Sequence, residues 1–229
     1  RLVGSEMCIR DSREAFTRRV LSAMVASGAS AALITGFPTA VSAAFPDGDA
    51  QLSIIISAIN NAVMLTRAPV LVPLQRFQSA LVVRFVAKRK RIHQALLGPV
   101  VSVMGLGVIG FVAAWIFGPL ILRLAFKPEL FVGGLILGLL TFASAFMGTL
   151  MITGVAVLAL DQHRWYVAGW VTASVVAFAL LFFGPWGVVR SVILALFAGP
   201  LAGSIVHVIG LSRAKACLLY TSPSPRDGL

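Results

Sequence analysis

Long apolar runs, separated by short polar and basic stretches, make up most of this chain. A helix needs roughly 20 predominantly apolar residues to cross a membrane. Six runs meet or approach that length when an occasional arginine is allowed: Val20–Phe45, Leu52–Val86, Ala95–Leu122, Leu130–Leu160, Trp165–Val189 and Ser191–Leu211. We therefore expect an all-α integral membrane bundle of six transmembrane helices.

The second run is the longest and can be divided in two ways. A break at the sequence "LTRAP" would leave Leu52–Leu65, which is short for a span, and would move the basic "AKRKR" stretch to the other side of the membrane. One continuous helix places the charges more consistently. Proline removes a helical hydrogen bond and kinks the helix, so we expect this single helix to be bent at Pro69 and Pro73.

Composition places the chain in the membrane. Hydrophobic residues make up 59% and charged residues 12%, and mean hydropathy is +0.95, whereas a soluble domain has about 45–50% apolar and about 25% charged residues. The net charge of +11 would by itself suggest nucleic-acid binding. With this hydropathy, the basic residues require a membrane explanation, and we expect no nucleic-acid partner.

The basic residues fall mainly on one side of the expected membrane. Eleven lie in the turns of one side: Arg13, Arg18, Arg19, Arg84, Lys88, Arg89, Lys90, Arg91, Arg164, Arg213 and Lys215. The other side has Arg123, Lys127 and Arg190. Cytoplasmic loops carry the excess of Lys and Arg, so we expect a multi-pass protein of the bacterial plasma membrane with residues 13 and 216 both near the cytoplasm. The stretch "RFVAKRKRIHQ" then serves as a topology anchor against anionic membrane lipids; a partner or nucleic-acid site is the alternative.

Two patterns that resemble catalytic or cofactor motifs have a simpler explanation. "GLGVIG" (Gly105–Gly110) matches a dinucleotide fingerprint, but it lies inside an apolar span rather than after a strand, so we expect it to pack helices closely. His93, His163 and His207 have no ligand spacing. We expect no catalytic residues, no metal and no cofactor, and we do not expect an enzyme.

Arg67 is the principal candidate for a binding residue. It lies fifteen residues beyond Leu52, about 22 Å along a helix, where a charge is costly and normally faces a bundle interior or a water-filled cavity. The polar neighbours on the same helix are Asn60, Asn61, Gln75 and Arg76. Asn60 and Arg67 share a face, which Gln75 approximately continues.

This polar, positive stripe has no acidic partner inside the expected spans. The acidic residues between positions 13 and 216 all fall in loops or at the flanks of the expected spans: Glu14, Asp47, Asp49, Glu129 and Asp161. An unpaired arginine facing a cavity suits an anionic ligand, phosphate in particular. The alternative is structural: Arg67 caps carbonyls freed at Pro69, or is held by a missing part of the protein.

Four stretches resemble a known transporter family. They are "LTRAPVLVPLQRFQSALVVRFV", "FGPLILRLAFKPELFVGGLILGLL", "ITGVAVLALDQHRWYVAGWVTA" and "RSVILALFAGPLAGSIVHVIGL". They resemble bacterial polysaccharide-export proteins, the lipid-linked oligosaccharide flippases of the multidrug/oligosaccharidyl-lipid/polysaccharide exporter superfamily. The likeness covers nearly all of residues 51–211 and rests on an Arg-Pro break in the second helix and a Gly-Pro motif in the third.

The resemblance implies a two-bundle transporter of which this chain is one six-helix half, more like the second. It implies flipping of a lipid-pyrophosphate-linked oligosaccharide across the plasma membrane for cell-surface polysaccharide synthesis. Its partners would be this anionic lipid-linked sugar, membrane lipids and the missing half. The alternatives are a multidrug or cation antiporter, which needs an intramembrane acid, and a polytopic glycosyltransferase or polymerase, which usually needs a large outer loop.

The two ends of the chain can be read from one DNA element in opposite directions. One choice of codons for Leu2–Ser12 has a reverse complement that encodes Cys217–Arg226. The element resembles the mosaic end of a transposon-based sequencing adaptor. We therefore expect residues 1–12 and 217–229 to be non-native, adaptor-derived tails and residues 13–216 to form the bundle. A natural peptide at each end is the alternative.

Overall fold

A computed structural model of the chain describes residues 13–46 and 49–220, and the described part is almost entirely helical. The main helices are α1 (Arg13–Ile34), α2 (Phe37–Ala44), α3 (Ala50–Ala87), α4 (Ile92–Ala125), α5 (Gly134–Ala159), α6 (His163–Phe183) and α7 (Val188–Tyr220). Two short 3-10 turns, η1 (Arg89–Arg91) and η2 (Pro128–Leu130), precede α4 and α5. The predicted all-α class is confirmed in the described part, and the adaptor hypothesis concerns ends that lie mostly outside it.

Among the residues that the structure describes, five helices are long and apolar enough to cross a membrane: α3, α4, α5, α6 and the Val188–Ala214 part of α7. The pair α1 and α2 makes a sixth span only if the two are counted together, because they meet at a 66° bend. The first predicted span, Val20–Phe45, is thus broken into two helices, and the predicted count of six transmembrane helices stays a prediction. The chain is a membrane-embedded, multi-pass helical protein.

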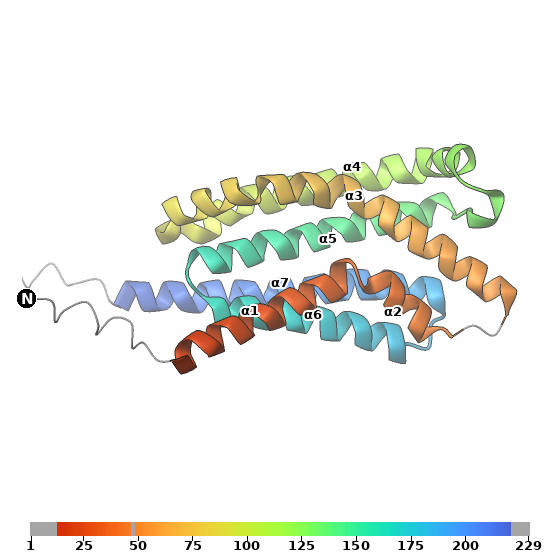
Figure 1. Cartoon of the computed structure of the whole chain (residues 1–229). Helices are drawn as coiled ribbons and strands as arrows, with labels where there is room; N and C mark the ends of the chain where they lie inside the picture. The colour runs from red at the N-terminus through yellow and green to blue at the C-terminus, as the bar shows by residue number, and fades with distance from the viewer. Residues whose placement is uncertain (1–12, 47–48, 221–229) are drawn as a thin grey trace, which may run out of the picture.

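The second apolar run forms one helix, as predicted. Helix α3 continues for 38 residues through Pro69 and Pro73, and it changes direction part-way along its length (Figure 1). Helix α6 ends at Phe183 rather than at the predicted Val189, because the sequence Gly184-Pro185-Trp186-Gly187 turns the chain before α7. Gly187 has a φ of 75°, a left-handed conformation that favours glycine.

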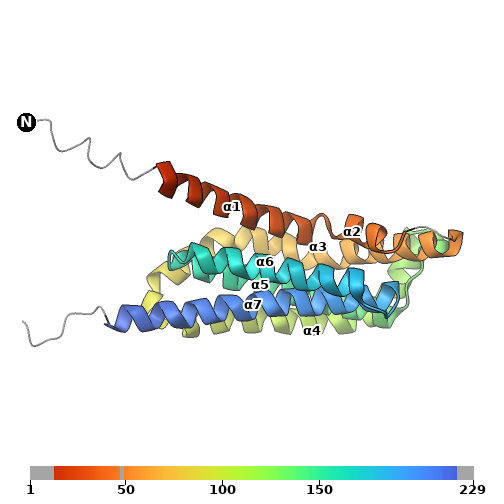
Figure 2. The same cartoon turned by 90° about the horizontal axis from the view of Figure 1, so that it is seen from below.

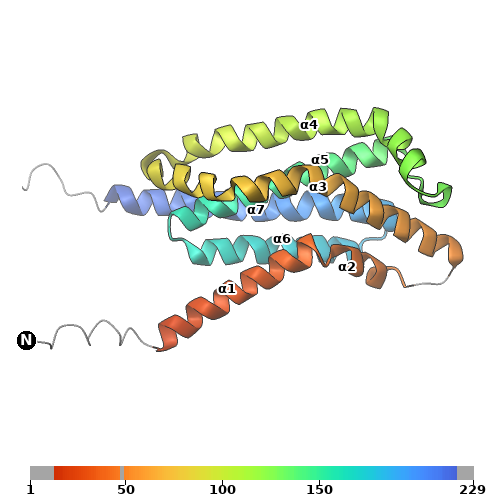
Figure 3. The ribbon, with the colours of Figure 1, turned by 45° about the horizontal axis from the view of Figure 1, so that its top comes forward.

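Helix α5 lies at the centre of the bundle. It packs against α3, α4 and α7, while α6 packs against α7 and α1, as the views from two sides show (Figures 2 and 3). The apolar window of α5 is 67% buried and that of α4 only 6% buried. Helix α4 is thus an outer helix whose apolar surface is left for lipid or for protein outside this chain.

The glycines of the "GLGVIG" stretch let α4 approach α5. A side chain at Gly107 would collide with Ala145, and one at Gly110 would come within 2.9 Å of Thr141 Cγ2. The expectation that this stretch packs helices is confirmed. Both glycines face α5, and the two helices lie so close there that only a residue without a side chain fits.

The turns between helices gather at the two ends of the bundle. The α3–α4 and α5–α6 turns lie at the same end as the start of α1 and the end of α7, and the α2–α3, α4–α5 and α6–α7 connections lie at the opposite end (Figure 1). An ion pair of 2.7 Å between Arg89 and Asp161 joins the first two turns. The side expected to be rich in positive charge is therefore one physical end of the molecule.

Candidate functional site

The break between α1 and α2 is the feature around which polar side chains of α3 gather. Pro38 lies at the start of α2 and has no N–H to donate to the carbonyl of Ile34, four residues earlier. The amides of Thr35 and Gly36 both bond to the carbonyl of Ala31. Carbonyls at the end of α1 therefore need partners from elsewhere, since water does not satisfy them inside a membrane.

Arg67 supplies these partners. Its side chain is 5% exposed, and its Nη1 donates to the carbonyls of Leu33 at 3.2 Å and Ile34 at 2.8 Å. The guanidinium also lies over the ring of Phe37, 5.2 Å from the ring centroid, a favourable cation–π arrangement. One side chain thus completes the end of α1 and packs on the start of α2.

Asn60, which lies two turns before Arg67 on α3, also contacts the break between α1 and α2. Its Nδ2 donates to the carbonyl of Pro38 at 3.2 Å. Two buried atoms of this group have no hydrogen-bond partner among the described residues: Nη2 of Arg67 and Oδ1 of Asn60. The structure brings Asn60 and Arg67 to one place, where they hold a broken helix and keep one donor and one acceptor free.

Asn61, Gln75 and Arg76 make no contact with the break. All three are exposed, and Gln75 and Arg76 begin a stretch, residues 75–80, in which every residue is exposed. The predicted stripe is therefore divided. Arg67 and Asn60 face inward to the break, and the other three residues face out of this bundle.

The structure places Arg67 in a carbonyl-capping role, although not the one expected. The carbonyls it caps belong to Leu33 and Ile34 of α1 and not to the turn freed by Pro69. Arg67 lines none of the described pockets. The pocket nearest to it in sequence, a groove of about 440 Å³ between α3, α4 and α5, is lined by apolar and small residues with the hydroxyl-bearing Thr66 and Thr141. Substrate binding by Arg67, Arg76, Gln75, Asn60 and Asn61 stays a prediction.

A second buried polar cluster, centred on His207, was not anticipated. His207 is fully buried, with Nδ1 3.0 Å from Thr153 Oγ1 and Nε2 3.2 Å from the carbonyl oxygen of Tyr166. Because a carbonyl can only accept, Nε2 is the protonated nitrogen. The hydroxyl of Thr153 lies 3.0 Å from Nδ1 and also 3.0 Å from the carbonyls of Thr149 and Leu150, and its single hydrogen is shared among these acceptors. The ring occupies the space of a missing side chain at Gly169, where any Cβ would collide with it.

The sequence carried only a weak signal for this cluster. Gly169 and His207 lie on different helices, α6 and α7, and Thr153 lies on a third, α5. Nothing in their spacing joins them, and only the glycine inside an apolar helix indicates a close approach. No group of three or more His, Cys, Asp or Glu that could hold a metal occurs in the part of the chain that the structure describes.

The comparisons with known proteins give relatives but no function. The chain is 39% identical over 198 residues to "Uncharacterized protein Rv1510" of Mycobacterium tuberculosis (strain ATCC 25618 / H37Rv). It is 37% identical over 198 residues to "Uncharacterized protein Mb3654" of Mycobacterium bovis (strain ATCC BAA-935 / AF2122/97). The aligned segment is 86% of this chain and 45% of each relative, so the chain spans less than half the length of these relatives. No protein-family model matches the chain, and no solved structure matches it.

Proposed function

We propose that this chain is one bundle of a membrane exporter that flips a lipid-pyrophosphate-linked oligosaccharide across the bacterial plasma membrane for cell-surface polysaccharide synthesis. The substrate class comes from the resemblance of four stretches of sequence to polysaccharide-export flippases. The multi-pass helical fold supports membrane transport in general. Under this proposal the activity belongs to a longer polypeptide with a second bundle.

The observation that carries the proposal is a group of three exposed polar residues on α3, named here the polar side of α3, which lies among exposed apolar residues such as Met64 and Val72. Asn61, Gln75 and Arg76 are exposed on a helix that has the length and the hydropathy of a membrane span. Arg76 lies eleven residues before the end of α3 at Ala87, about 16 Å along the helix. Polar and charged groups at such a depth face a water-filled cavity or another protein segment rather than lipid. A second bundle placed against this side would enclose a polar, cationic cavity suited to a pyrophosphate.

The broken helix supports the same class of protein. Discontinuous transmembrane helices line the binding sites of many secondary transporters, because their ends present free backbone groups. Here Arg67 and Asn60 hold the break and keep Nη2 and Oδ1 unpartnered. Under this proposal Asn61, Gln75 and Arg76 contact the substrate directly, while Arg67 and Asn60 hold the broken helix beside them.

The length of the relatives is also consistent with two bundles. The aligned segment makes up 45% of each, so each has room for a second segment of similar size. The missing half of the transporter would then be part of the same polypeptide.

The proposed topology puts the α3–α4 and α5–α6 turns in the cytoplasm, since Lys and Arg are concentrated at that end. Single cysteines at Asp49 and Lys90, in a background without Cys8 and Cys217, test it with a membrane-impermeant thiol reagent. Asp49→Cys should be labelled from outside and Lys90→Cys should not. The reverse pattern, or labelling of both, contradicts the topology.

The function is tested in the full-length polypeptide that contains this segment, purified and reconstituted in vesicles. A fluorescent lipid-pyrophosphate-linked oligosaccharide is loaded in the inner leaflet, and its appearance in the outer leaflet is measured by quenching. Arg76→Ala and Gln75→Ala should each slow the appearance about tenfold or more, at normal protein abundance, because each removes a polar contact to a charged headgroup. Arg67→Lys should retain part of the activity, since an ammonium keeps the charge but loses the two-pronged geometry.

A control lies on the outer helix α4. Ser102→Ala removes an exposed hydroxyl of this helix and should not alter transport. Efflux of ethidium, a cationic drug, is measured in the same vesicles. Ethidium efflux without movement of the lipid-linked sugar would replace the flippase by an antiporter, and no movement of either compound would refute transport by this route.

A further inference from the structure

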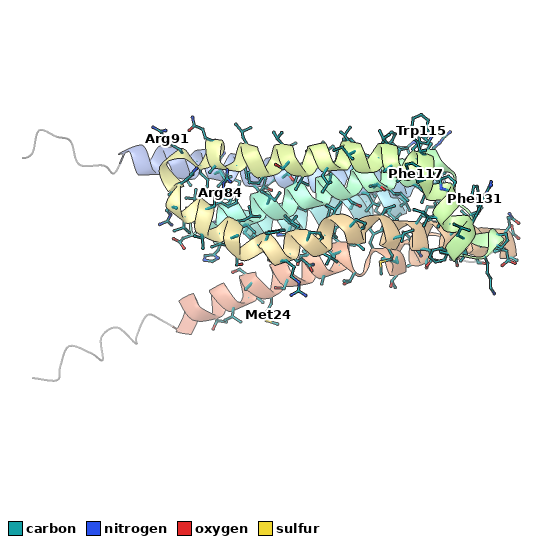
Figure 4. The ribbon with its side chains drawn as sticks, turned by 90° about the horizontal axis from the view of Figure 1, so that it is seen from above. Met24, Arg84, Arg91, Trp115, Phe117 and Phe131 are labelled. Carbon is teal, nitrogen blue, oxygen red and sulfur yellow. The ribbon has the colours of Figure 1, made fainter. Side chains whose placement is uncertain are left out.

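The turn between α3 and α4 gathers positive charge around a concave surface. Lys88, Arg89, Arg91 and Gln94 line a pocket of about 540 Å³ at this turn. Arg84, from the last turn of α3, reaches across to α4, where its Nη2 lies 3.1 Å from the position of a Cβ on Gly98. Figure 4 shows Arg84 and Arg91 at the same end of the molecule, beside the turn.

Most of this charge has no counter-charge among the side chains that the structure describes. The ion pair between Arg89 and Asp161, at 2.7 Å, is the one ion pair found among the described side chains. The carboxylate of Asp161 balances the charge of Arg89 and holds the Arg89 side chain toward the α5–α6 turn. Arg84, Lys88 and Arg91 have no such pair within the described part of the chain. Like charges held this close repel one another, so an anion in the pocket would relieve an unfavourable arrangement.

The position of the pocket indicates which anion it meets. It lies where two long apolar helices, α3 and α4, end together, which is the level of lipid phosphates rather than of the hydrocarbon. Arginine binds phosphate oxygens through a two-pronged set of N–H donors, and lysine adds a mobile point charge. Gln94 can donate a further, neutral hydrogen bond.

The basic residues at the opposite end of the bundle do not form an equivalent site. The pocket there, of about 420 Å³, contains Arg123 and Lys127. Arg123 lies over the ring of Phe131, 5.1 Å from its centroid, and the acidic Glu129 belongs to the adjacent η2 turn. Arg123 is thus a cation of the same type at the other membrane level, which makes it a suitable control.

We propose that the α3–α4 turn is a binding site for a phosphate group carrying two negative charges, such as the terminal phosphate of a phosphomonoester or pyrophosphate lipid. Lys88 and Arg91 are its principal ligands, Arg84 contributes from the membrane side, and Arg89 contributes least because Asp161 already matches its charge. This site differs from a general anchor because it distinguishes a dianionic phosphate from a monoanionic phosphodiester. It is also separate from the polar side of α3 and does not depend on export.

The chain in neutral detergent micelles, examined by native mass spectrometry, tests this site with phosphatidic acid and phosphatidylglycerol of the same acyl chains. Phosphatidic acid, a phosphomonoester, should bind about tenfold more tightly than the phosphodiester. Lys88→Gln and Arg91→Gln should each weaken it about tenfold, and Arg89→Gln less than about threefold. Arg123→Gln should have no effect. The helical content of each variant, measured by circular dichroism, shows that it is folded.

A second measurement distinguishes a lipid from a free phosphate compound. Inorganic pyrophosphate is added to the complex with phosphatidic acid. Displacement shows that the pocket recognises the anion itself, and retention shows that it requires the attached lipid; both support a phosphate site. Equal binding of the two lipids, or equal losses in the Arg123 variant and the Lys88 and Arg91 variants, would overturn the proposal and leave only a general attraction of positive charge to anionic surfaces.

Discussion

The surroundings of Arg67 and those of His207 are two ways of burying a polar side chain in an apolar bundle. Arg67 lies at an interruption, where it donates to carbonyls at the end of α1 and stacks on the first residue of α2. His207 lies in an uninterrupted helix and fits a notch at Gly169, with its ring nitrogens bonded to Thr153 and to the carbonyl of Tyr166. Arg67 donates to backbone carbonyls of α1 that lack a helical donor. His207 fills a space that close helix packing has created.

The difference predicts how each region responds to change. Removing Arg67 leaves backbone carbonyls without donors, which is costly in a medium without water. Removing a single hydrogen bond of His207 leaves its packing intact, because the ring is held by the shape of the notch. The stability of the protein should therefore fall more when a polar group is removed at the α1–α2 break than when one is removed beside His207.

The largest effect should follow Arg67→Ala. We expect the free energy of unfolding to fall by about 2–4 kcal/mol, because two hydrogen bonds from a charged donor are lost and their acceptors remain buried. Steric trapping in bicelles measures this change. Arg76→Ala, on the exposed side of the same helix, is the control and should stay within about 0.5 kcal/mol. Equal losses in the two variants would mean that the break does not depend on Arg67.

A smaller effect should follow Gly169→Ala, which adds one methyl group at the notch. The new Cβ would collide with the ring of His207, so overpacking should cost about 1–3 kcal/mol. Gly105→Ala is the matched control, since nothing lies within 4 Å of its added Cβ and alanine favours the helix. In the double variant Gly169→Ala/His207→Ala, the cost of the methyl group should largely disappear; if it persists, the ring does not determine the need for glycine.

The smallest effect should follow Thr153→Val, which removes the hydroxyl bonded to Nδ1 of His207 and preserves the shape of the side chain. We expect a loss of about 0.6–1.7 kcal/mol, the range for such bonds within membranes. Thr149→Val serves as control, because its hydroxyl bonds to Ala145 of its own helix. A loss in Thr153→Val that exceeds that of Arg67→Ala, by the same assay, would reverse the comparison.

The contrast also explains what sequence reasoning could reach. The depth of Arg67 in an apolar run identified it as a residue with a special role, and spacing placed Asn60 on the same face. The break itself was not predicted, because the run from Val20 to Phe45 carries no charge and hydropathy does not report backbone hydrogen bonds. Gly36 and Pro38 were the local signals for it.

The His207 cluster was out of reach for a different reason. Its three contributing helices meet only through tertiary packing, and no spacing along the chain relates Gly169 to His207. The continuity of α3 through two prolines, by contrast, was predictable because only an unbroken helix kept the basic residues on one side. Sequence patterns therefore located the helices and the costly charge, while the partners of the buried groups depended on which helices became neighbours.

The length of α4 has a consequence for how the protein meets its bilayer. Arg91 and Arg123 lie 32 residues apart along the chain at the two ends of this outer helix, a contour length of about 48 Å at 1.5 Å per residue. The helix contains Pro99 and Pro119, and its last part bends away from the rest (Figure 3). The hydrocarbon layer is about 30 Å thick, and the whole bilayer with its headgroups about 40–45 Å. The contour length of α4 therefore exceeds the thickness of the hydrocarbon, and tilt or the bend of the helix must take up the excess. Thinning the membrane should increase the tilt or the bend of α4, which makes this outer helix a gauge of bilayer thickness.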